Sequence, residues 1–212
     1  MIVRIQGMDS TTADVNRKAD KDLRRVVVFV VLLNAAYFGV EFAVATAIGS
    51  VSLFADSVDF LEDASVNLLI FTALTWSARR RARVGMVLSG ILLLPALAFV
   101  WALWSKFNHP LPPPPIPLTI TGLGALAVNL ACAFLLVRYR HHRGSLTRAA
   151  FLSARNDAVA NIAIVGAGLL TLALPTVWPD VIVGLGIACM NVDAAREVWS
   201  AALSEHRAAT DS

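Results

Sequence analysis

The stretch "SLFADSVDFLEDASVNLLIF", residues 52–71, carries four acidic side chains inside one of the most apolar regions of the chain. Asp56, Asp59, Glu62 and Asp63 all fall within eight residues. The neighbouring residues are mostly apolar, and a stretch of about 20 such residues is long enough to cross a membrane as a helix. Because charge is costly inside a bilayer, intramembrane acids face a bundle interior or a water-filled cavity and mark functional sites.

The whole chain has the composition of a membrane protein. Its 212 residues are 57% hydrophobic and only 16% charged, and its mean hydropathy is +0.67. Soluble domains carry more charge than this. Apolar segments of spanning length lie near residues 25–48, 52–76, 85–105, 118–139, 149–174 and 177–199. The sequence therefore predicts an all-α polytopic membrane protein with six transmembrane helices.

The distribution of Lys and Arg predicts the orientation of these helices. Basic residues gather in the N-terminal arm, in "SARRRARVG" between the second and third segments, and in "RYRHHRGSLTR" between the fourth and fifth. The alternate loops hold only Lys106. Positively charged loops stay cytoplasmic, so we expect both termini on the cytoplasmic side. Topology then explains the net charge of +3, and we expect no nucleic-acid partner.

The expected organisation is one membrane domain with short flanks. Residues 1–24 form a cytoplasmic arm, residues 25–200 the six-helix domain, and residues 201–212 a short cytoplasmic tail. The polar, mixed-charge start predicts no cleaved signal peptide. Cys132 and Cys189 lie in apolar runs and predict no disulfide framework. We expect a multi-pass protein of the bacterial inner membrane.

A helical projection places the acids of the second segment on one stripe. At about 100° per residue, Asp63 lies about 40° from Asp59, Asp56 about 60° and Asn67 about 80°. Glu62 falls about 60° to the other side, at the edge of the stripe, and is the weakest candidate. The stripe is expected to face the bundle interior.

The fifth segment repeats the pattern in "FLSARNDAVANIAIV". Ser153, Asp157 and Asn161 follow at four-residue steps, and Asn156 flanks them. Asp59 and Asp63 can direct oxygens at one cation, and Asp157 from another helix can complete its coordination. A hydrogen-bonded network that joins helices is the alternative, although one acid would suit that role better than a stripe.

These residues resemble the cation diffusion facilitators, a family of six-span antiporters that exchange divalent metal for protons. The resemblance extends over residues 25–200 and is densest in "LNAAYFGVEFAVATAIGSVSLFADSVDFLEDASVNLL". The family's second-span signature, ADSxHxxxD or ADSxDxxxD, maps its metal ligands onto Asp59 and Asp63. Its fifth-span HxxxD aligns with Ser153 and Asp157, which the resemblance therefore adds to the metal-site residues.

Two departures from the family pattern bear on the expected function. Ser153 replaces the fifth-span histidine, so the site is oxygen-rich, with Asn156 or water filling the gap. Imidazole suits zinc and its neighbours, whereas oxygen ligands suit harder ions, so the metal stays open between the Zn/Co/Cd class and Mn or Fe. The expected short form also lacks the family's C-terminal cytoplasmic domain, and we expect a homodimer formed through membrane helices.

Further polar residues are accessory candidates. Asp56 orients the site or relays protons, and Asn161 lies on the same face of the fifth segment as Ser153 and Asp157. Glu41 either modulates the site or pairs with a polar neighbour. His141 and His142 either gather metal at the cytoplasmic mouth or belong to an ordinary solvated loop.

The expected function is divalent metal efflux by proton-coupled antiport with alternating access. The metal is the transported substrate, so we expect no prosthetic group and no enzymatic activity. A membrane phosphotransferase would need DG and AR between its aspartates, and both are absent from the acidic stretch. The alternative is a non-transporting membrane subunit or a metal sensor with a degenerate site.

Overall fold

Helices account for most of the chain that the computed structural model describes, which comprises residues 3–73, 97, 99–137 and 145–190. The long helices are α1 (Val3–Ile48), α2 (Val51–Ala73), α4 (Pro115–Val137) and α5 (Ser145–Ala173). Residues 99–108 form a shorter helix, and Trp178–Met190 form another. These ranges contain no strand, as the predicted all-α class requires.

A glycine turn joins α1 to α2 and aligns them side by side. Gly49 has a φ of 64°, in the left-handed region that favours glycine. The Ser50 amide donates to the Ala45 carbonyl at 3.2 Å, which closes the end of α1 as a Schellman cap. Ser50 also caps the next helix, because its Oγ accepts a hydrogen bond from the Leu53 amide at 3.2 Å. The tight turn predicted at "IGSVS" is thus present.

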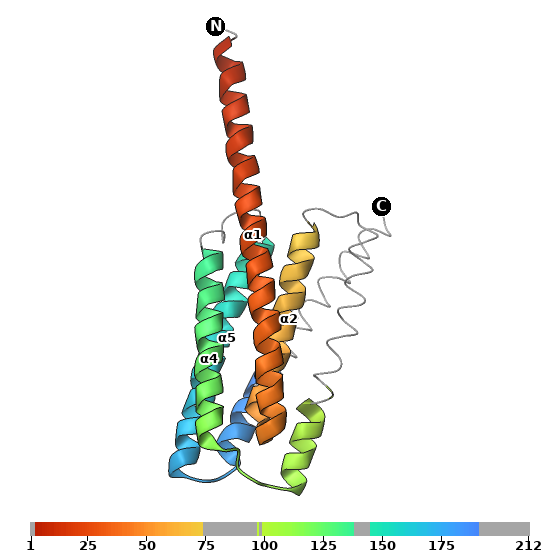
Figure 1. Cartoon of the computed structure of the whole chain (residues 1–212), viewed down its shortest axis with the longest axis vertical. Helices are drawn as coiled ribbons and strands as arrows, with labels where there is room; N and C mark the ends of the chain where they lie inside the picture. The colour runs from red at the N-terminus through yellow and green to blue at the C-terminus, as the bar shows by residue number, and fades with distance from the viewer. Residues whose placement is uncertain (1–2, 74–96, 98, 138–144, 191–212) are drawn as a thin grey trace.

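The four long helices form a bundle in which each packs mainly on two neighbours. α1 packs against α2 and α4, and α5 packs against the same two helices. The N-terminal part of α1 projects beyond the other helices (Figure 1). One apolar cluster includes Leu23, Val27 and Leu136, and a second includes Ala45, Leu118 and Ile164.

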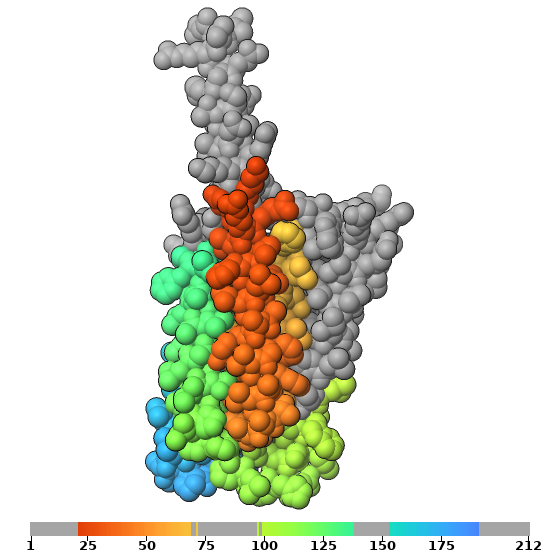
Figure 2. Space-filling view, viewed as in Figure 1, coloured from red at the N-terminus to blue at the C-terminus, as the bar shows by residue number. Residues whose placement is uncertain are grey.

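The polarity of the bundle is that of a protein surrounded by lipid. Phe29, Leu32 and Phe134 are 52%, 61% and 75% exposed, whereas Glu41 and Asp56 are fully buried. In the described residues, three helical stretches are long and apolar enough to span a membrane: Lys21–Ile48, Pro115–Val137 and Ser153–Ala173. α2 packs against α1 (Figure 2) and α5, which contain two of these stretches. Its own sequence is also largely apolar but carries four acidic residues. The chain is an all-α polytopic membrane protein.

The predicted boundaries differ from the observed helices at several ends, and α5, for example, begins at Ser145, four residues before the predicted segment. The arm expected over residues 1–24 is helical from Val3 and continues without a break into the first span. The proline run also differs from prediction, because α4 begins at Pro115, three residues before the predicted segment. Proline fits the first turn of a helix, where its missing N–H has no intrahelical partner. The described residues exclude 74–76 of the second predicted segment, 85–96 and 98 of the third, 138–139 of the fourth and 191–199 of the sixth.

Candidate metal centre

A small pocket collects acidic side chains from α2 and polar side chains from α5. Its volume is about 110 Å³, and it also touches the helix Trp178–Met190. The lining residues are Asp59, Glu62, Asp63, Ser153, Asn156, Asp157 and Met190. The four-residue spacing on each helix explains this arrangement, because Asp59 and Asp63 on α2 and Ser153 and Asp157 on α5 present successive turns of one face.

Direct contacts tie the two helices together at this pocket. Ser153 Oγ donates a hydrogen bond to Asp63 Oδ1 at 2.9 Å. The Asp157 carboxyl also lies beside that of Asp63. Asp59 and Asp63 are only 9% and 8% exposed. Several carboxyl groups this close together repel one another when ionised, so the pocket favours protons or a cation between them.

The donor atoms suit a hard or borderline divalent cation. Carboxylate, hydroxyl and amide oxygens dominate the lining, and the Met190 thioether is the one soft group on it. Within the described ranges, no group of three or more His, Cys, Asp and Glu is arranged closely enough to hold a metal ion. The acids share a pocket, but tight coordination requires their side chains to move closer together.

Asp56 and Asn161 lie in a second polar cluster, away from the pocket lining. Asn161 Nδ2 donates to Asp56 Oδ2 at 2.5 Å, and Asn129 Nδ2 donates to Asn161 Oδ1 at 2.9 Å. Glu41 contacts Asp56 from α1. No donor in the described part of the chain reaches Asp56 Oδ1 or either carboxyl oxygen of Glu41. The cluster joins α1, α2, α4 and α5 at their centre.

The structure therefore divides the predicted site residues into two groups. Asp59, Asp63, Ser153 and Asp157 line one pocket with Asn156, whereas Glu41, Asp56 and Asn161 belong to the second cluster. The role of each as a metal ligand stays a prediction. His141 and His142 lie outside the described residues.

Sequence reasoning gave too little weight to two lining residues. Glu62 was placed at the edge of the stripe, yet it borders the pocket. The helical projection places Glu62 about 60° from Asp59, the same angle as for Asp56, so it already indicated that Glu62 could border the site. No sequence pattern indicated a role for Met190 at the site, because a single methionine in an apolar segment is ordinary core composition.

An all-α membrane bundle with buried acids around a polar pocket defines a class of proteins that handle cations within the bilayer. The chain belongs to the cation efflux family: residues 27–205 match its cation efflux transmembrane domain. This confirms the family resemblance seen in the sequence.

A curated relative is the zinc transporter ZitB of Pectobacterium atrosepticum, which is 23% identical to the chain over 186 residues. The match covers 80% of the chain and 57% of the relative. The chain thus spans little more than half the length of the curated relative that it matches.

Proposed function

We propose that the chain exports divalent metal cations across a membrane, with the metal held by Asp59, Asp63, Asp157 and Ser153. The observation that carries this proposal is the single pocket lined by these four side chains. Membership of the cation efflux family supports the reaction class. The relative named as a zinc transporter supports a metal of that kind.

The ligand chemistry narrows the metal to two groups. Three carboxylates and a hydroxyl form a hard donor set, which favours Mn²⁺ or Fe²⁺. Zn²⁺, Co²⁺ and Cd²⁺ remain the second group, because carboxylates bind them as well and Met190 adds a soft donor. Ser153 is central to this choice, since it stands where the family pattern has an imidazole.

Proton antiport follows from the same carboxyl groups. A bound dication stabilises their ionised forms, whereas the empty, desolvated site favours protonation. Metal that enters from the cytoplasm displaces protons, and protons from the other side displace the metal. The second cluster, Glu41 and Asp56 with Asn161, acts as an accessory group that orients α2 or passes protons.

The remaining parts of the proposal follow from the membrane setting. The protein acts as a multi-pass transporter of the bacterial inner membrane, with both termini cytoplasmic. It forms a homodimer through its membrane helices, and the exposed apolar faces of these helices supply the surface for a second copy or for lipid. It carries no prosthetic group and catalyses no covalent reaction.

Flux into proteoliposomes tests the transporter and its site together. The full chain is reconstituted in vesicles with an acidic lumen, and uptake of Mn²⁺, Fe²⁺, Zn²⁺, Co²⁺ and Cd²⁺ is measured. We expect uptake of at least one metal, which collapses when the pH gradient is removed. Asp63→Asn and Asp157→Asn should abolish uptake, because each removes one charge from the pocket, while the exposed control His109→Gln should retain it.

Two outcomes contradict different parts of the proposal. Unchanged uptake in both aspartate variants would show that the pocket is not the site that holds the transported metal. If calorimetry detects metal binding but no metal is taken up, the protein is instead a non-transporting subunit or a metal sensor.

A further inference from the structure

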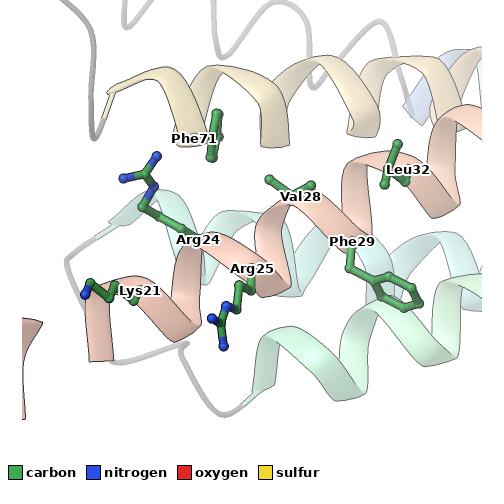
Figure 3. Close-up of a pocket in the computed structure, with 7 residues that line it drawn as sticks. All are labelled: Lys21, Arg24, Arg25, Val28, Phe29, Leu32 and Phe71. Atoms are coloured by element: carbon green, nitrogen blue, oxygen red, sulfur yellow. The ribbon is translucent and has the colours of Figure 1, made fainter. Parts of the chain in front are cut away.

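A groove of 460 Å³ lies along α1, and none of its lining residues lines the acidic pocket (Figure 3). One end of the groove carries Lys21, Arg24 and Arg25, which are all exposed. No acidic residue in the described part of the chain lines it. The groove therefore presents a concentrated positive charge with no acidic counter-ion among the described residues, and an anion is its natural complement.

The floor of the groove is apolar. Val28, Phe29 and Leu32 of α1 are 38%, 52% and 61% exposed, and Phe71 of α2 borders the same space. The Arg24 guanidinium lies 5.1 Å from the centre of the Phe71 ring, a cation–π contact that holds it at the boundary between the charged and apolar halves. A small hydrophilic anion would make no apolar contact with this floor.

The dimensions of the groove match those of a lipid. Positions 21, 24, 25, 28 and 32 recur at helical spacing and share one side of α1. At about 1.5 Å per residue they extend over roughly 16 Å, which is about half of a hydrocarbon core of about 30 Å. The charged side chains lie at the N-terminal end of this row of residues, and the apolar side chains lie toward its C-terminal end. This order matches one membrane leaflet, which is charged at its headgroups and apolar along its acyl chains.

We propose that this groove is a binding site for an anionic phospholipid. Lys21, Arg24 and Arg25 contact the phosphate and headgroup, and one acyl chain lies along Val28, Phe29 and Leu32. Basic pockets at the membrane surface select anionic headgroups, and each Lys or Arg there contributes about 1 kcal/mol, or roughly fivefold in affinity. The bound lipid bridges α1 and α2, the helix that carries the acidic stretch.

Lipid binding to the purified full chain tests this site without any transport measurement. Native mass spectrometry is used to measure the dissociation constants of phosphatidylglycerol and phosphatidylcholine in detergent. We expect phosphatidylglycerol to bind more tightly by at least about tenfold. The triple variant Lys21→Gln/Arg24→Gln/Arg25→Gln should remove this preference, and Leu32→Ser should weaken both lipids.

The matched control removes an equivalent charge elsewhere. Arg155→Gln changes an exposed arginine of α5 and should keep the preference. If the triple variant loses its helical circular dichroism, Arg25→Gln alone should reduce the preference roughly fivefold. Equal binding of the two lipids, an unchanged triple variant, or an equal loss in Arg155→Gln would each overturn the proposal. Binding of soluble glycerol phosphate as tight as that of phosphatidylglycerol would also overturn it, because the apolar floor would then contribute nothing.

Discussion

Two buried acidic sites in this bundle differ in whether their oxygens have hydrogen-bond donors. Asp180 is fully buried and accepts from Ser50 Oγ at 2.6 Å, from Ser52 Oγ at 2.7 Å and from the amides of Val51 and Ser52 at 2.8 and 3.0 Å. Lys106 adds a favourable electrostatic interaction. At the centre of the bundle, Glu41 has no donor in the described residues, and Asp56 has one only on Oδ2.

The difference separates an acid whose oxygens accept several hydrogen bonds from acids whose oxygens lack a donor among the described residues. The carboxylate of Asp180 accepts hydrogen bonds from the first amides of α2, where a negative charge also complements the helix dipole. Glu41 and Asp56 keep unsatisfied oxygens, and the pocket acids crowd one another. Such groups cost folding free energy and are typical of functional sites.

The largest expected effect follows from removing Asp180. Asp180→Ala leaves two serine hydroxyls and two amides without an acceptor, so the free energy of unfolding should fall by about 3–5 kcal/mol. Denaturant unfolding in detergent, followed by circular dichroism, measures this. The control is Asp157→Asn in the pocket. A loss in that control as large as the loss in Asp180→Ala would erase the distinction between Asp180 and the pocket acids.

An intermediate effect is expected at the second cluster. Asp56→Asn removes a buried charge beside Glu41 and should leave the free energy of unfolding unchanged or raise it by about 1 kcal/mol. Metal uptake by proteoliposomes should fall in the same variant. A loss of stability with full uptake would instead assign Asp56 the role that Asp180 has.

The smallest expected effect concerns metal preference at the pocket. Ser153→His adds an imidazole beside Asp63 and should raise the affinity for Zn²⁺ relative to Mn²⁺ by about tenfold, or about 1.4 kcal/mol. Calorimetry with each metal measures the ratio. Ser105→His, on the helix of residues 99–108, introduces the same group away from the pocket and should leave the ratio unchanged. An equal ratio in both variants would mean that Ser153 does not contact the metal.

Much of the fold could be predicted because the sequence signals are local. Long apolar runs predicted the helices, and Gly49 predicted the turn between α1 and α2. The arm of residues 3–24 could not be separated from the first span, because helical hydrogen bonds continue from polar into apolar sequence without any change of geometry.

The sequence predicted only those features of the site that depend on a single helix, and not the contacts between helices. The projection correctly put Asp56, Asp59 and Asp63 on one side of α2. It could not show that Asp59 and Asp63 meet α5 at a pocket while Asp56, one turn earlier, meets Glu41 and Asn161. Asp180 was missed entirely, because its partners lie about 130 residues away in the chain and no local pattern reports such a contact.

The bonds of Asp180 also have a mechanical consequence. They join the first turn of α2 to the start of the helix Trp178–Met190, and Gly184 of that helix has no room for a Cβ against the Val51 backbone. The two helices are therefore fastened to each other at one end, and each also contributes to the acidic pocket, through Asp59 and Met190.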